Sequence, residues 1–183
     1  MRLFIAIELP KPVKEALVGI QREVKSKSAG GRFVAPEGFH LTLRFIGESN
    51  ALAEAAAAMR EATRGIRPFM LKLGQYGCFD RDTGATGFVN VNGDLKELGI
   101  LREALRCAMF DRGFSRERGR FTPHITLGRN IVHDELTLGE LKAMPAINAT
   151  MTVNGITLFE SVRGMGNAVE RGMVYHALHK ERF

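Results

Sequence analysis

The chain has 183 residues, of which 45% are hydrophobic and 25% charged, with a formal net charge of +6 at pH 7. This length fits one domain with a sizeable core, and the composition is that of a soluble globular protein, which excludes a disordered chain. Two cysteines, Cys78 and Cys107, exclude a disulfide framework and favour a reducing, cytoplasmic location. The basic balance favours a polyanionic partner such as nucleic acid, with a merely solvated basic surface as the alternative.

The first part of the chain alternates strands and helices. Its opening apolar stretch ends at Glu8, too short for a secretory or membrane-spanning segment and typical of a strand. After Pro12, apolar residues recur at helical spacing until about Lys27. The elements predicted here are a strand at 2–8, a helix at 12–27, a short extended piece at 32–34, a strand at 39–46 and an Ala-rich helix at 50–65.

The second part of the chain contains more strand. Residues 80–84 are typical of a hairpin loop, so the strands on either side should be antiparallel neighbours. Asp94 is the predicted cap of a third helix, and Gly128 predicts an early end to the strand that begins at His124. The predicted elements are strands at 69–79 and 86–92, a helix at 95–110, a short strand from 124, a helix at 134–144, and long strands at 148–162 and 171–179.

One four-residue pattern occurs twice: His40-Leu41-Thr42-Leu43 and His124-Ile125-Thr126-Leu127. In a strand, successive side chains point to opposite faces, so His and Thr share one face and the apolar pair shares the other. Two such matches among five histidines are expected by chance with a probability on the order of one in a thousand. Since a strand, helix, strand, strand order precedes Phe69 and a similar order follows it, we expect two related halves, each contributing one motif strand.

The residue types of the motif suit phosphate chemistry. Imidazole accepts a proton when neutral and donates one when charged, so two histidines can serve as general base and general acid near neutral pH. A Thr hydroxyl beside each His can bond a phosphate oxygen. The alternative for a single copy is a solvated His beside a Thr of ordinary strand composition, but this does not explain the matched spacing.

Two arginines near the motifs are candidate phosphate ligands. Arg44 lies on the same face as His40 and Thr42 if the strand alternates regularly. Arg129 is out of phase with His124 and reaches the site only through a bend, which Gly128 makes possible. The alternative for both is a solvated basic side chain.

Other chemistries have weaker support in the sequence. No histidine or cysteine has the partners or spacing of a metal site, and no glycine-rich nucleotide loop is present, so we expect neither a metal nor a cofactor. Two basic clusters flank the motifs and could guide an RNA backbone toward them or form solvated faces. Their members are Arg22, Lys25, Lys27 and Arg32 in one, and Arg112, Arg116, Arg118 and Arg120 in the other.

The paired motifs, together with their flanks, resemble the two-histidine (2H) phosphoesterase superfamily, and within it the RNA 2',3'-cyclic phosphodiesterase or 2'-5' RNA ligase family. The similarity covers nearly the whole chain. It departs from the family where Phe33 replaces a frequent Trp and where the loop at 163–171 is long and Gly-rich. The matching segments are 2–7, 40–47, 121–129 and 158–161.

The resemblance implies a single bilobed α+β domain spanning 1–183, with two mostly antiparallel sheets, helices outside and the active-site cleft between the lobes. It implies hydrolysis of an RNA terminal 2',3'-cyclic phosphate to a 2'-phosphate without a metal, and the reverse 2'-5' ligation. His40 would be the proton donor and His124 the proton acceptor. Thr42, Thr126 and Arg129 would bind phosphate. A monomer acting on RNA or nucleotide ends, without a membrane partner, is expected; the alternative is a nucleic-acid or nucleotide binding module without turnover.

Overall fold

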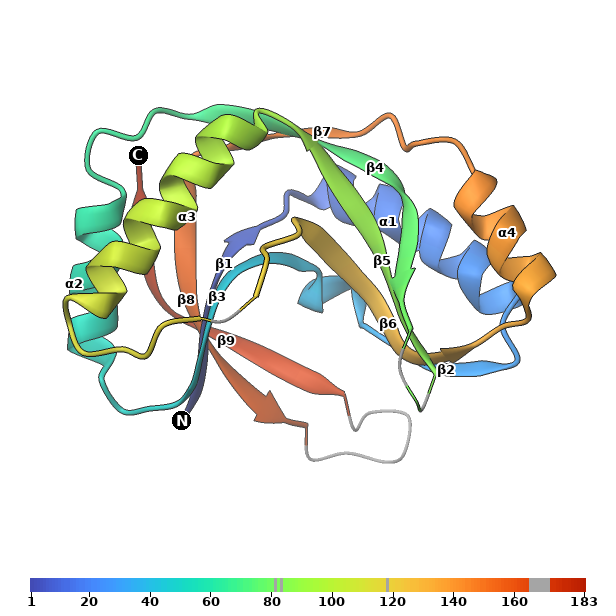
Figure 1. Cartoon of the computed structure of the whole chain (residues 1–183), viewed down its shortest axis with the longest axis horizontal. Coiled ribbons are helices and arrows are strands. Elements are labelled where there is room, and N and C mark those ends of the chain that lie inside the picture. The colour runs from blue at the N-terminus through green and yellow to red at the C-terminus, as the bar shows by residue number, and fades with distance from the viewer. Residues whose placement is uncertain (81, 83, 118, 165–171) are drawn as a thin grey trace.

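The computed structural model describes residues 1–80, 82, 84–117, 119–164 and 172–183, and in these residues two antiparallel sheets are flanked by four helices (Figure 1). The first sheet has the strand order β3 (His40–Glu48), β1 (Arg2–Glu8), β8 (Gly155–Arg163) and β9 (Met173–Arg182). The second sheet has the order β2 (Gly30–Phe33), β6 (His124–Val132), β5 (Ala85–Gly93), β4 (Phe69–Phe79) and β7 (Thr150–Val153). The predicted α+β class with mostly antiparallel sheets is confirmed.

The helices form two pairs at opposite ends of the molecule (Figure 1). Helices α1 (Lys11–Ser26) and α4 (Glu135–Ala143) lie against the second sheet. Helices α2 (Leu52–Ala62) and α3 (Leu95–Phe110) pack on each other and against the first sheet. A single 3-10 turn, η1 (Pro36–Gly38), precedes β3. Each sheet is therefore covered by one pair of helices.

Burial follows the sequence pattern closely in the first elements. Strand β1 buries five consecutive side chains between exposed ends, as expected for a central strand. Helix α1 begins with Pro12 in its first turn, where a missing backbone N–H costs nothing, and all four apolar positions of its predicted face are buried. These positions are Val13, Leu17, Ile20 and Val24.

The two sheets do not correspond to the two halves of the sequence. As expected, β3 belongs to one sheet and β6 to the other. However, β2 from the first half pairs with β6, while β8 and β9 from the second half complete the sheet of β1. The predicted division of the chain into two halves near Phe69 is therefore wrong for the sheets, because each sheet contains strands from both halves. The two motif strands, β3 and β6, are in contact although they belong to different sheets.

Two predicted strand boundaries are also wrong. Gly128 does not end its strand, since β6 runs for nine residues from His124 to Val132. The predicted strand at 148–162 is two strands, because the chain leaves the second sheet after β7, turns at Asn154 and enters the first sheet as β8. Gly155 begins β8 where a Cβ would lie 2.6 Å from the carbonyl oxygen of Glu181, so only glycine fits this approach to β9.

Asp94 has a different role from the one predicted. It occupies the N-cap position of α3, but its side chain makes no capping hydrogen bond. Instead, its Oδ2 accepts a hydrogen bond of 2.8 Å from the backbone N–H of Met70 on β4. Asp134, at the start of the predicted helix at 134–144, does cap its helix, since its carboxylate accepts a hydrogen bond from the N–H of Thr137 in α4. The Gly-rich loop at 163–171 lies largely outside the described residues, as does the predicted start of β9 at 171.

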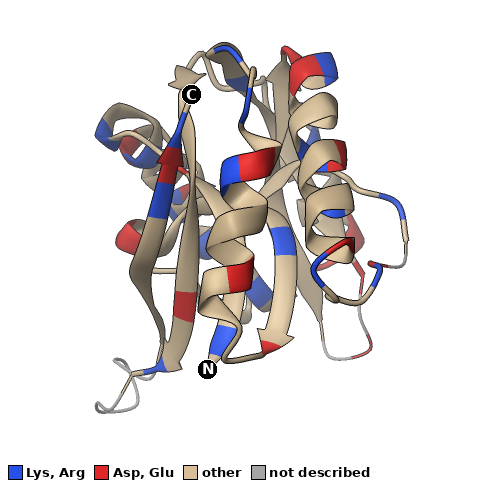
Figure 2. Cartoon of the chain, turned by 90° about the vertical axis from the view of Figure 1, so that its left-hand side faces the viewer, with Lys and Arg blue, Asp and Glu red and all other residues tan. Residues whose placement is uncertain are grey.

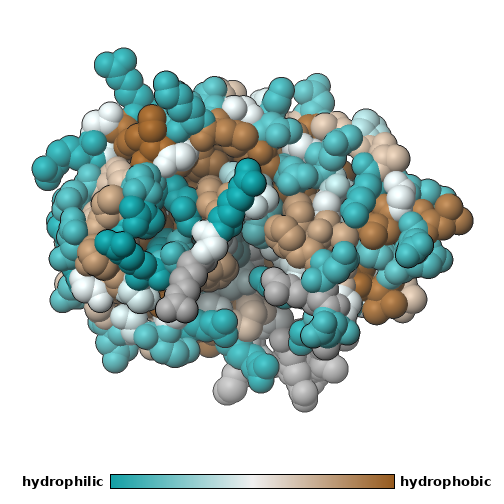
Figure 3. Space-filling model, in the orientation of Figure 1, coloured by the Kyte–Doolittle hydropathy of each residue, from teal (hydrophilic) through white to brown (hydrophobic). Residues whose placement is uncertain are grey.

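The surface is mixed in charge and in hydropathy. Lys and Arg alternate with Asp and Glu along the helices that face the viewer in Figure 2. Hydrophilic side chains cover much of the face in Figure 3, where apolar side chains form several separate patches. Within the described residues, no helix combines the length and the apolarity needed to cross a membrane.

Candidate active site

One cavity of about 670 Å³ is lined by side chains from both motif strands. His40 and Thr42 line it from β3, and His124 and Thr126 line it from β6. The apolar motif residues face the other way and are at most 2% exposed: Leu41, Leu43, Ile125 and Leu127. The predicted division of each motif into a cavity face and a core face is therefore confirmed.

Each motif strand contains an irregularity directly after its Thr. On β3, Thr42 pairs with Ala6 and Arg44 pairs with the adjacent Ile5, so one extra residue is inserted between them. On β6, Thr126 pairs with Phe88, while Gly128 pairs with the residue adjacent to Phe88. Such a bulge shifts the alternation of the strand by one residue. As a result, the fifth residue after each His, rather than the fourth, shares the face of the His.

The bulges decide where the two candidate arginines point. Arg129, the fifth residue after His124, lines the cavity, as the bend proposed at Gly128 requires. The corresponding residue after His40 is Phe45, which also lines the cavity and is 61% exposed. The expectation that Arg44 shares the face of His40 is wrong, because the bulge turns its side chain into the protein, where it is 4% exposed.

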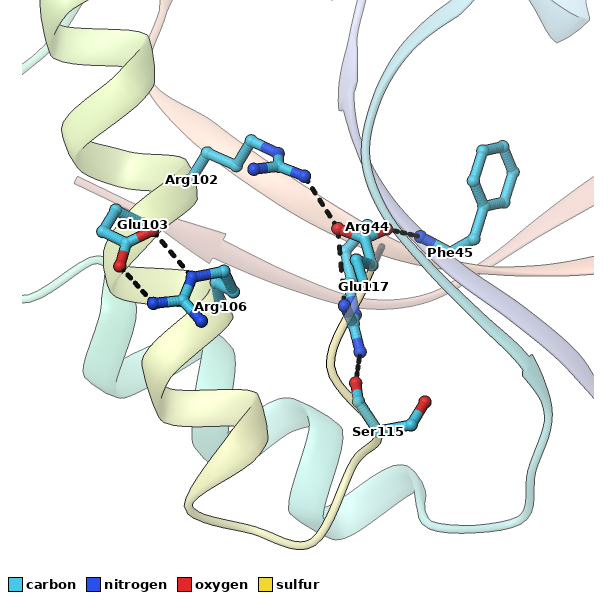
Figure 4. Close-up of polar contacts among 7 residues, drawn as sticks. All are labelled: Arg44, Phe45, Arg102, Glu103, Arg106, Ser115 and Glu117. Atoms are coloured by element: carbon cyan, nitrogen blue, oxygen red, sulfur yellow. Dashed lines mark hydrogen bonds and ion pairs between the residues drawn. The ribbon is translucent and has the colours of Figure 1, made fainter. Parts of the chain in front are cut away.

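Buried Arg44 is held by the segment that precedes the second motif (Figure 4). Its Nη1 lies 3.4 Å from Oε2 of Glu117, and its Nη2 donates to the backbone carbonyl of Ser115. Oε2 of Glu117 also lies 2.9 Å from Nη2 of Arg102 on α3. Oε1 of the same carboxylate accepts from the N–H of Phe45 at 3.3 Å. Glu117 therefore fixes the β3 bulge, and Arg44 has a structural rather than a ligand-facing position.

The two histidines have matching hydrogen bonds. Nδ1 of His40 lies 2.7 Å from the carbonyl oxygen of Gly38, and Nδ1 of His124 lies 2.7 Å from the carbonyl oxygen of Thr122. A carbonyl can only accept, so each Nδ1 must carry the hydrogen. In the neutral ring this leaves Nε2 as an acceptor, and in the charged ring as a donor. Each imidazole is thus oriented for proton transfer through Nε2.

The surroundings of His40 disfavour its charged form. The pKa of His40 is lowered from 6.5 to about 4, chiefly by burial and to a smaller extent by the positive charges of Arg129 and Lys14, while the hydrogen bond to the Gly38 carbonyl opposes these effects. The ring of His40 lies against Phe4 and Tyr175, with centroid distances of 4.8 and 5.0 Å. His40 is therefore neutral at pH 7 in the absence of an anion.

The aromatic residues of the cavity do not follow from the local sequence pattern of the motifs. Regular alternation predicts Phe45 on the face opposite to His40, and Tyr175 belongs to β9, far from both motifs in sequence, yet both side chains line the cavity. Phe79 and Phe88 flank His124 at centroid distances of 5.3 and 5.1 Å. Only a prediction of strand pairing could have found them, because no local pattern links them to the motifs.

Comparison with known proteins agrees with this geometry. The model of the 2'-5' RNA ligase superfamily matches residues 10–164. The chain belongs to this superfamily. This confirms the resemblance inferred from the paired motifs.

Individual relatives of this 2'-5' RNA ligase superfamily protein point the same way. The RNA 2',3'-cyclic phosphodiesterase of Thermotoga maritima is 34% identical over 131 residues, which cover 70% of each chain. A protein of the same name from Geobacillus stearothermophilus is 29% identical over 161 residues, covering 86% of this chain and 51% of that protein. The crystal structure of Escherichia coli LigT with 3'-AMP is similar with a TM-score of 0.78 and 27% identity, covering 99% of this chain and 97% of LigT.

Proposed function

We propose that this protein hydrolyses the 2',3'-cyclic phosphate at the end of an RNA chain to a 2'-phosphate. The observation that carries the proposal is the convergence of two His-x-Thr strands, one from each sheet, on a single cavity that also contains Arg129. The names of the relatives supply the substrate class, because several are called RNA 2',3'-cyclic phosphodiesterase. The family resemblance supplies the direction of proton transfer, with His40 as donor and His124 as acceptor.

In the proposed reaction, Nε2 of His124 takes a proton from water as the water oxygen attacks phosphorus. The bond from phosphorus to O3' breaks, and Nε2 of His40 gives its proton to the departing O3'. Thr42 and Thr126 donate hydrogen bonds to the non-bridging phosphate oxygens, and Arg129 neutralises their charge. These side chains provide acid, base and charge neutralisation, so the proposed mechanism does not require a metal.

The low pKa of His40 is compatible with its role as proton donor only if bound substrate raises this pKa. A proton donor must be charged before reaction, whereas His40 has a pKa of about 4 in the free protein. Burial is the largest cause of the low pKa, and a bound cyclic phosphate opposes it by placing a negative charge that attracts the charged imidazole and also offsets the smaller repulsion from Arg129. We therefore expect the substrate itself to raise the pKa of its general acid.

The test uses an oligoribonucleotide with a 2',3'-cyclic phosphate end, incubated with the protein and a chelator. The wild type should form a 2'-phosphate end, and His40→Ala and His124→Ala should each lower kcat by about 100- to 10,000-fold. His176→Ala is the matched control, because this histidine is exposed on β9 and does not line the cavity. An end group that stays cyclic, or motif variants as active as the control, would refute the proposal.

A binding module without turnover is the second candidate. It predicts that the wild type binds RNA ends but converts none, and that binding survives both motif substitutions. The E. coli relative was crystallised with phosphate, ATP and NADP+ as well as 3'-AMP, which is the reason for measuring binding and turnover on the same sample.

A further inference from the structure

The cavity contains a second cationic side chain, which belongs to neither motif strand. Arg2, the first residue of β1, lines the same space as Arg129 and is exposed. It comes from the first sheet, whereas Arg129 comes from the second. The cavity can therefore offer a guanidinium to an anion at two different places.

Arg2 lies in a row of polar side chains that crosses three strands of the first sheet. Leu3 pairs with Glu160 in the antiparallel ladder of β1 and β8, so the next position brings Arg2 opposite Ser161. Ser161 in turn pairs with Tyr175 on β9. All three side chains line the cavity, and we call Arg2, Ser161 and Tyr175 the Arg2 row. It combines a guanidinium with two hydroxyl groups, all of which can donate hydrogen bonds to a phosphate oxygen.

One row of aromatic residues separates Arg2 from the catalytic histidine. Phe4 pairs with Phe159 in the ladder of β1 and β8, and their rings stack at a centroid distance of 5.2 Å. The ring of Phe4 lies against that of His40 at 4.8 Å. Because two residues of a strand span about 7 Å, Arg2 starts about this far beyond Phe4 along β1.

The charges that act on the neighbouring titratable groups agree with this separation. Burial raises the pKa of Tyr175, and the positive charges of Arg129 and Arg2 both oppose this rise. The main positive charges that lower the pKa of His40 include Arg129 and not Arg2. Tyr175 therefore lies within reach of both guanidinium groups, while His40 senses only the one from the second sheet.

We infer that the Arg2 row binds the phosphodiester on the 5' side of the terminal nucleoside, while His40 and Arg129 engage the cyclic phosphate of that nucleoside. This inference rests on the proposed function. A single ribose separates the two phosphate groups, which suits the step of about 7 Å between the two rows. The cavity volume of about 670 Å³ is sufficient for a nucleotide that carries both groups.

This subsite has a consequence for substrate choice. A contact with a backbone phosphate positions a nucleic acid without reading its bases. The Arg2 row should therefore favour the end of an RNA chain over a free nucleoside 2',3'-cyclic phosphate, whatever the terminal base is.

The experiment compares two substrates that differ by one phosphate group. Adenosine 2',3'-cyclic phosphate is supplied with a 5'-hydroxyl or with a 5'-phosphate at one ionic strength, and kcat/KM for opening of the cyclic phosphate is measured for each. The wild type should prefer the 5'-phosphorylated substrate by about tenfold, the effect of one hydrogen bond between charged groups. Arg2→Gln should bring the ratio of the two kcat/KM values close to one.

A matched control and a second substrate complete the test. Arg67→Gln should keep the wild-type ratio, because Arg67 is exposed between α2 and β4 and does not line the cavity. A dinucleotide with the same cyclic end supplies the phosphodiester itself. Its kcat/KM relative to that of the unphosphorylated nucleoside should show the same dependence on Arg2.

The outcomes separate the two proposals. A wild type that opens none of these cyclic phosphates would overturn the proposed function and this inference together. A wild type that hydrolyses all of them without preference would overturn the inference alone, as would a preference that Arg2→Gln retains. An Arg2 effect on the 5'-phosphorylated nucleoside but not on the dinucleotide would overturn the assignment to an RNA phosphodiester. Because the readout is a ratio, a general loss of activity in a variant does not mimic the expected result.

Discussion

Replacement of His40 by Asn should remove a specific dependence of stability on pH. The pKa of His40 is about 4 in the folded protein, against 6.5 when it is free. Between these values the unfolded chain binds a proton that the folded chain does not, so the folded state loses stability as the pH falls from about 6.5 to 4. Below pH 4 both states are protonated and the loss is complete.

The magnitude follows from the difference in pKa. A shift of about 2.5 units, at 1.36 kcal/mol per unit, makes the wild type lose about 3 kcal/mol through this residue alone. His40→Asn keeps a side-chain N–H for the Gly38 carbonyl but does not titrate, so this part of the loss should disappear.

Urea unfolding at intervals from pH 7 to pH 4 measures the effect. The free energy of unfolding of the wild type should fall relative to that of His40→Asn by about 3 kcal/mol across this range. His176→Asn, an exposed substitution on β9, should follow the wild-type slope. Parallel curves for the wild type and His40→Asn would show that burial does not disfavour the charged imidazole, and the argument would fail.

Two further predictions concern the arginines near the motifs. Arg129→Gln should raise the pKa of His40 in the free protein, because the positive charge of Arg129 lowers it; NMR titration of the imidazole resonances measures the change. Glu117→Gln should lower the free energy of unfolding by about 2 kcal/mol, because it leaves the charge of Arg44 buried without a counter-ion. Glu103→Gln, which breaks an exposed pair on α3, is the control in urea unfolding and should have little effect.

These two predictions have clear contrary results. An unchanged His40 titration in Arg129→Gln would mean that the guanidinium does not act on the imidazole across the cavity. A Glu117→Gln variant as stable as the Glu103→Gln control would mean that the Ser115 carbonyl alone stabilises buried Arg44.

Features that depend on the spacing of neighbouring residues could be predicted from the sequence. The helical face of α1 and the inward His and Thr of both motifs were predicted because burial imposes a period on neighbouring residues. The strand exchange was not predicted, because the turn at Asn154 separates two apolar segments that look like one strand. The sequence of neither segment indicates which sheet it joins, because the strands that pair with them, β1 and β4, lie more than sixty residues away in the chain.

The bulges explain why the four-letter motif alone gives an incomplete site. Leu43 and Leu127 are apolar like their neighbours, so an inserted residue leaves no trace in the hydrophobic pattern, yet it changes which residue faces the cavity. With regular strands, Arg44 would face the phosphate and Arg129 would not. The bulges reverse this assignment and require a counter-ion, Glu117, for the arginine that is turned inward.

The same bulges also make the two motifs chemically unequal. At the fifth position after the His, β3 presents the ring of Phe45 and β6 presents the guanidinium of Arg129. The cavity therefore has an aromatic ring on the side of β3 and, on the side of β6, a cationic group that suits a phosphate. Burial is the main cause of the lowered pKa of His40, and the positive charge of Arg129 adds to it. In the proposed mechanism a phosphate anion bound at Arg129 offsets this repulsion and attracts the charged imidazole directly. In the proposed mechanism, substrate binding and charging of the general acid are thus a single coupled event.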